Sequence, residues 1–127
     1  MSEEADPLET VARYLLEGEM RSDNSIRHSA FTPPSSLKHS VFRIDSLSDE
    51  EIWNLAIEFV EPHRGKVIGR GDLLVSEVLK ENLHVIPAEP PPRHADICGW
   101  PRDDRERRVT IAKVLAAKAS PAKKRDA

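Results

Sequence analysis

One segment of the chain constrains the expected fold most strongly: Pro87-Ala88-Glu89-Pro90-Pro91-Pro92-Arg93-His94-Ala95-Asp96-Ile97-Cys98-Gly99-Trp100-Pro101. These fifteen residues hold five of the ten prolines, the only cysteine and one of the two tryptophans. Proline fixes its own φ and favours extended geometry in the residue before it, so the flanks of His94–Trp100 are expected to be stiff and non-helical. The sequence therefore predicts a rigid loop that presents its side chains to a partner.

The residues before this loop predict a helix, a long connection, a strand and a second helix. Asp6 is a good helix cap, and apolar residues recur at helical spacing from Leu8 to Leu16, which predicts the first helix. Residues 20–38 are polar and rich in turn formers, so they are expected to form a surface connection. Residues 39–45 have the β-branched and aromatic character of a strand. A Ser-x-x-Glu capping box at residues 48–51 predicts the second helix.

The remaining segments complete the expected fold. Residues 66–69 suggest a brief strand, residues 71–81 fit either a helix or a strand, residues 83–86 predict a strand, and residues 103–118 predict the last helix. This order predicts a small single α+β domain in which a short β-sheet is packed by about four helices. The domain is expected to span residues 6–119, between a disordered N-terminus at 1–5 and a disordered basic tail at 120–127.

Charge is distributed unevenly along the chain. Residues 102–127 contain nine Lys/Arg and four Asp/Glu, which leaves ten Lys/Arg and eighteen Asp/Glu in residues 1–101 and a net charge of −3. No apolar run is long enough to span a membrane, the acidic start lacks the features of a secretory signal, and the single cysteine fits a reducing compartment. We therefore expect a cytoplasmic protein without membrane contact.

The leading functional hypothesis is a binding or interaction module with a protein partner. Its expected surface consists of the loop His94–Trp100 and the strand residues 40–43, with His94, Trp100, Arg93 and Arg43 as the binding residues. Tryptophan and arginine are frequent at the centres of interfaces. Trp100 also fits a second interpretation, in which its ring is buried and fixes the loop to the core.

A small enzyme is the alternative, and the sequence leaves open whether the protein is one. If the strand 39–45 pairs with residues 93–98, His39, Arg43, His94 and Asp96 are candidates to surround a small anion pocket. Imidazoles exchange protons near neutral pH and arginine binds phosphate, which suits a metal-independent hydrolase or transferase acting on RNA or nucleotides. The structural interpretation is that the side chains of His94 and Asp96 form hydrogen bonds with backbone groups of a turn. No metal ligands and no cofactor are predicted, because a single cysteine and scattered histidines lack metal-site spacing.

A third hypothesis is a nucleic-acid-binding accessory protein. The C-terminal helix and the tail residues Lys123, Lys124 and Arg125 carry the positive charge that phosphates attract. Acidic residues interrupt the run from Arg102 to Arg108, so a solvated helix with ion pairs along its surface is the competing interpretation.

Two short motifs also carry a family resemblance. Ser40-Val41-Phe42-Arg43, the later run His94-Ala95-Asp96-Ile97-Cys98-Gly99-Trp100-Pro101 and a terminal alanine-rich helix resemble a layout of small uncharacterised bacterial proteins. The resemblance covers most of residues 10–118. It implies no activity and assigns no catalytic residue.

Overall fold

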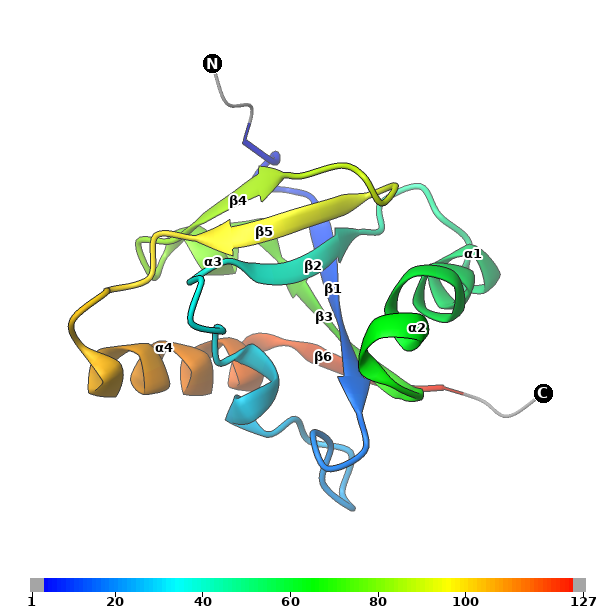
Figure 1. Ribbon diagram of the computed structural model, residues 1–127, viewed down its shortest axis with the longest axis horizontal. Helices are drawn as coiled ribbons and strands as arrows, with labels where there is room; N and C mark the ends of the chain where they lie inside the picture. Colours follow the sequence, from blue (N-terminus) through cyan, green and yellow to red (C-terminus); the bar gives the residue numbers. More distant parts are fainter. Residues whose placement is uncertain (1–3, 125–127) are drawn as a thin grey trace.

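A six-stranded antiparallel sheet forms the centre of the computed structural model, which describes residues 4–124 (Figure 1). The strands, in chain order, are β1 (Thr10–Leu16), β2 (His39–Arg43), β3 (Val67–Leu74), β4 (His84–Pro87), β5 (His94–Cys98) and β6 (Ser120–Lys123). Their order across the sheet is β4-β5-β2-β1-β3-β6, and every neighbouring pair is antiparallel.

Helical segments cover both faces of the sheet. A 3-10 turn, η1 (His28–Phe31), precedes β2, and α3 (Val75–Leu79) follows β3 without a break. A continuous helical region combines α1 (Asp49–Leu55), a π-helical turn η2 (Ala56–Val60) and α2 (Glu61–Arg64), while α4 (Arg105–Lys118) precedes the last strand. The predicted capping box of α1 is confirmed, because the Ser48 side chain accepts from the Glu51 amide and the Glu51 carboxylate accepts from the Ser48 amide.

The prediction of an α+β domain with a short sheet and about four helices is wrong. Among the described residues, the sheet has six strands and the helical regions number about three, within one small domain. The main error is the first expected helix, which is β1. Val11 and Leu15 face one core while Ala12 and Tyr14 face the other, so the strand is buried on both sides and its apolar residues do not alternate with polar ones. Such a run has the same apolar spacing as an amphipathic helix.

The capping signal at Asp6 is real, but it stabilises a turn. The Leu8 amide donates to Oδ1 of Asp6 at 2.8 Å, and the Asp6 amide donates to Oε2 of Glu9 at 2.8 Å. These two bonds resemble those at a helix start, yet the chain then enters β1. The sheet, with its larger buried surface, therefore overrides the local preference.

Two hydrophobic cores lie on opposite faces of the sheet. Leu15, Phe31 and Leu115 belong to the core between the sheet and α4, and Tyr14, Phe42 and Ile52 belong to the core beneath α1 and η2. In Figure 1, α4 runs below the sheet and the α1–α2 region lies to its right. Within the described residues, no helix has the length and apolar composition that a bilayer span requires.

The last strand corrects the expected disordered tail. Residues 120–123 pair with β3 in the register Gly69↔Lys123 to Asp72↔Ser120. Gly69 permits this close approach, since a Cβ there would lie 2.9 Å from the carbonyl oxygen of Ala122. At the other end of the chain, the Ala5 amide donates to the Val85 carbonyl at 2.9 Å. The rest of both expected disordered ends, residues 1–3 and 125–127, including Arg125, lies outside the described residues.

Candidate anion-binding site

Residues 94–98, which were expected to belong to an exposed loop, form an inner strand of the sheet. Residues 94–98 form β5, which is hydrogen-bonded to β4 on one side and to β2 on the other. Ala95 and Ile97 are fully buried toward α4, while His94, Asp96 and Cys98 alternate with them. The prolines at 90–92 lie in the short connection between β4 and β5. The prediction that residues 94–100 form a rigid exposed loop is therefore wrong.

Trp100 lies in the core rather than on a binding surface. Its side chain is only 4% exposed, and its Nε1 donates to the carbonyl oxygen of Ile97 at 3.0 Å. The indole ring contacts the His39 ring edge-on, with the ring centroids 6.4 Å apart. Of the two interpretations of Trp100, the structure therefore supports the one in which its ring packs the chain after β5 onto the core.

The four residues of the enzyme hypothesis do not share one cleft. Register pairs Phe42 with His94, as expected if the two strands are neighbours. His39 is buried on the α4 side, whereas His94 packs edge-on against Phe42 in the other core, with Nδ1 2.8 Å from the Ala88 carbonyl. His94 Nε2 lies 3.6 Å from Oδ1 of Asp96. The structural interpretation fits His94 well, since its ring nitrogen forms a hydrogen bond with a backbone carbonyl.

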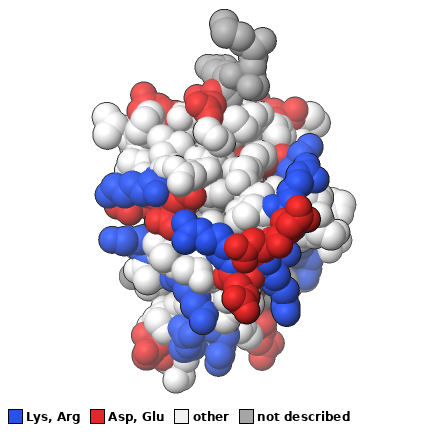
Figure 2. Space-filling view, turned by 90° about the vertical axis from the view of Figure 1, so that its left-hand side faces the viewer, with Lys and Arg blue, Asp and Glu red and all other residues white. Residues whose placement is uncertain are grey.

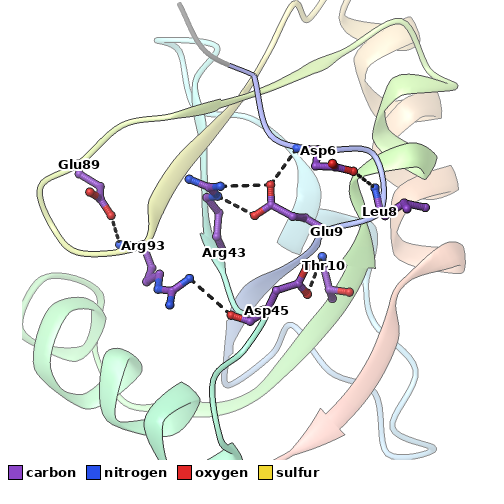
Figure 3. A network of polar contacts seen from close by, with 8 residues as sticks. All are labelled: Asp6, Leu8, Glu9, Thr10, Arg43, Asp45, Glu89 and Arg93. Carbon is purple, nitrogen blue, oxygen red and sulfur yellow. Dashed lines mark hydrogen bonds and ion pairs between the residues drawn. The ribbon is translucent and has the colours of Figure 1, made fainter.

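Arg43 and Arg93 belong to a polar network that joins the N-terminal turn to the sheet (Figure 3). Arg43 forms a two-pronged ion pair with Glu9, with Nε–Oε1 at 2.8 Å and Nη2–Oε2 at 3.2 Å. This hydrogen bond lowers the pKa of the Glu9 carboxyl. Arg93 donates from Nη1 to the Asp45 carbonyl at 3.4 Å, and its amide donates to Glu89 at 2.7 Å. Both arginines thus hold segments of the fold together.

A different set of basic residues lines a pocket of about 290 Å³ between β1 and β2, which we call the wedge pocket. The two strands pair only at Val11↔Arg43 and Ala12↔Phe42, and then β1 continues along β3 while β2 diverges from it (Figure 1). The divergence leaves space between them. The residues that line it include Arg13, Thr32, Lys38, His39, Ser40 and Arg64.

Arg13 and His39 are fixed in this pocket by a shared acceptor. Arg13 Nε donates to the carbonyl oxygen of Ala30 at 3.1 Å, and His39 Nε2 lies 2.8 Å from the same oxygen. Arg13 Nη1 also donates to the carbonyl of Ser40 at 2.9 Å. The bond between His39 and the Ala30 carbonyl requires a proton on Nε2, because a carbonyl oxygen can only accept. The turn η1, which supplies Ala30, therefore orients both side chains.

Burial and mutual repulsion set the charges in the wedge pocket. Burial, reinforced by the charge of Arg64 and opposed by Glu19, lowers the pKa of Arg13 to about 10, so the guanidinium stays positive at neutral pH. Burial, with the nearby charge of Arg13 adding to it, lowers the pKa of His39 to about 3. His39 is therefore a neutral imidazole at neutral pH, and the positive charge comes from the arginines and Lys38.

A second hollow, which we call the α4 groove, lies beside the wedge pocket. It has a volume of about 610 Å³ and shares Thr32 and Pro34 with the wedge pocket. One wall consists of arginines at the start of α4, and the other is the largely uncharged segment before β2. The residues that line the groove include Arg102, Asp103, Arg105, Arg108, Val109, Pro33, Pro34 and Leu37.

The α4 face carries dense charge. Figure 2 views the molecule from the side on which α4 begins, and there Lys and Arg side chains gather across the middle and lower part with Asp and Glu among them. Arg108 is held in place, because its Nη1 donates to the carbonyls of Pro101 and Arg102 at 2.8 and 2.7 Å. Arg102 and Arg105 form no ion pair with any described residue.

Sequence reasoning missed Arg13 and both pockets. The signal available was a single cation inside the otherwise apolar run from Val11 to Leu16, which fits a residue at a buried polar position. No motif links Arg13 to Lys38 and Arg64, because only the divergence of β1 and β2 brings them together. Within residues 4–124, no three His, Cys, Asp or Glu side chains lie close enough to hold a metal ion.

Comparison with known proteins gives no relative, since no family model, no curated protein and no solved structure matches the chain.

Proposed function

We propose that this protein is a small binding module that holds an acidic segment of a partner protein in the α4 groove. The observation that carries the proposal is the concentration of positive charge in two adjoining hollows of a chain whose net charge is −3. Arg102, Arg105 and Arg108 line the α4 groove, and Asp103 is the only carboxylate among the described residues that line either hollow. Complementary charge steers association and selects an acidic partner.

The uncharged wall of the groove favours a polypeptide over a nucleic acid. Pro33, Pro34, Leu37 and Val109 offer surface against which aliphatic side chains pack. No Phe, Tyr or Trp is among the described lining residues, whereas proteins that bind single strands stack bases on such rings. Lys124, one of the cations of the nucleic-acid hypothesis, lies 3.7 Å from Oε2 of Glu61. Acidic side chains also stand between the cations on this face (Figure 2).

The test measures binding of a fluorescein-labelled peptide of alternating Glu and Leu by fluorescence anisotropy. Arg102→Glu with Arg105→Glu reverses the charge of the groove wall and should weaken binding by roughly a hundredfold, since each reversed contact costs about one power of ten. The matched control is Arg107→Glu with Lys118→Glu, which makes the same change in net charge at two exposed positions of α4 that do not line the groove. Its effect should be roughly threefold or less through long-range charge alone.

Three results would contradict the proposal. One is absence of binding at low salt, and another is an equal effect of the groove and control variants, which indicates a diffuse charge attraction. The third is that a single-stranded oligonucleotide displaces the peptide and binds more tightly, which would favour the nucleic-acid hypothesis. The cytoplasmic location and the resemblance to small bacterial proteins stay predictions.

A further inference from the structure

Arg13 carries a charge that the fold does not neutralise. Both of its hydrogen-bond acceptors, the carbonyls of Ala30 and Ser40, are uncharged, and no described carboxylate forms an ion pair with it. Removing a charge from water is costly, so buried cations usually have an anionic partner. The carboxylate of Glu19 acts on Arg13 without forming an ion pair with it. Glu19 is engaged elsewhere, because its Oε1 accepts from the Leu16 amide at 2.8 Å and lies 3.5 Å from Nη2 of Arg64.

One nitrogen of Arg13 remains available for a ligand. Among the described residues, every fully buried side-chain nitrogen or oxygen has a hydrogen-bond partner. Nη2 of Arg13 has no protein partner, so it is not one of these fully buried atoms. It is therefore accessible from the wedge pocket that Arg13 lines. The guanidinium plane is fixed by the other two nitrogens. This leaves a preoriented donor at the pocket wall, which is the arrangement that costs least entropy when a ligand binds.

Two further cations complete the wall. Arg64 reaches the pocket from the end of α2, fixed by Nη1, which donates to the Tyr14 carbonyl at 3.2 Å. Lys38, in the connection before β2, also lines the pocket, and its ammonium group forms no ion pair with a described residue. Three cations from different parts of the chain therefore line one small hollow, and no described carboxylate lines it.

We infer that the wedge pocket binds a compact oxyanion with two negative charges, such as a phosphoryl group. Arginine donates two parallel hydrogen bonds to such oxygens, and lysine adds a mobile charge. The volume of about 290 Å³ accommodates the group with bound water. The wedge pocket adjoins the α4 groove, but none of its three cations lines the groove, so the inference does not depend on the groove proposal. The oxyanion is either free or carried on a phosphorylated side chain.

Binding is mapped by titrating the ¹⁵N-labelled protein with inorganic phosphate at constant ionic strength. Amide shifts should concentrate at Arg13, Lys38 and Ser40 and saturate. Lys38→Ala combined with Arg64→Gln should weaken this binding by roughly tenfold or more, since two charge-assisted contacts are lost. Lys66→Ala, which removes an exposed cation close to Arg64 in the chain and outside the pocket, is the matched control and should leave binding within roughly twofold.

A peptide with one phosphoserine distinguishes the two sources. Affinity at least roughly tenfold above that of inorganic phosphate identifies a phosphorylated polypeptide as the ligand, and equal or weaker affinity identifies a free oxyanion. Absence of saturable shifts at the wedge pocket in the wild-type protein overturns the inference, whatever the variants do. So does unchanged binding in the folded double variant. The variant that combines Arg102→Glu with Arg105→Glu should still bind phosphate at the wedge pocket. Phosphate binding therefore tests the wedge pocket even if the groove proposal fails.

Discussion

His39 makes stability depend on pH in a way that one substitution should remove. Its pKa is about 3 in the folded protein and 6.5 when unperturbed. Below about pH 6.5 the unfolded chain binds a proton at this position that the native protein does not, so the stability present at higher pH is lost as pH falls toward the folded value. With about 1.4 kcal/mol per pK unit, acidification from about pH 7 to about pH 4.5 should cost roughly 2–3 kcal/mol through His39 alone.

The perturbation is His39→Gln, because the glutamine amide can donate to the Ala30 carbonyl without binding a proton. The assay is urea unfolding at several pH values and constant ionic strength, followed by the fluorescence of Trp53 and Trp100. The variant should be less stable at neutral pH, since it loses ring contacts with Phe31 and Trp100. Its free energy of unfolding should nevertheless fall with pH by about 2–3 kcal/mol less than that of the wild type.

Comparison of the wild type with the variant cancels the contribution to pH-dependent stability of carboxylates that titrate in both proteins. Glu9 and Glu51, whose pKa values are lowered, also remove stability as pH falls, and they do so equally in wild type and variant. His63→Gln, at an exposed position in α2, controls for the loss of an imidazole. If wild type and His39→Gln lose stability in parallel between about pH 7 and pH 4.5, the reasoning about burial beside Arg13 is refuted.

Three further substitutions test the packing that holds the site. Tyr14→Phe should lower the free energy of unfolding by about 1–2 kcal/mol in urea titrations, because the buried hydroxyl donates to the Ile52 carbonyl; an unchanged midpoint contradicts this. Ser48→Ala should cost about 1 kcal/mol by thermal unfolding through loss of the α1 cap, and rescue by Thr is expected. Gly69→Ala should force β6 away because the added Cβ meets the Ala122 carbonyl, which faster amide exchange across β3 and β6 would report; unchanged exchange argues against this contact.

Short local signals in the sequence predicted some elements correctly. The capping box placed α1 correctly, and the β-branched and aromatic composition of residues 39–45 placed β2. The ambiguity at residues 71–81 was real, because the chain changes from strand to helix between Leu74 and Val75. In each case the sequence signal lies within a few consecutive residues.

Long-range pairing explains the failures. Proline density suggested an exposed loop at residues 94–100, yet the alternation of Ala95 and Ile97 with polar residues was a strand signal that the prolines obscured. Ser120–Lys123 contains Pro121 and Lys123 and is followed by Lys124, a composition typical of an exposed tail. It nevertheless forms a strand, because β3 offers an open edge. The wedge pocket could not be predicted from the sequence, because its existence depends on where β1 and β2 separate.

The position of β6 has a consequence for biosynthesis. Gly69 to Asp72 pair with residues that are translated about fifty positions later, so one flank of the nascent sheet has no neighbour until residues 120–123 emerge from the ribosome. An uncovered flank of this kind is a template for pairing with other chains. Once β6 docks, Pro121 occupies the outermost strand, and an imino acid there discourages addition of another strand. Premature termination before residue 120 should therefore produce a protein prone to self-association.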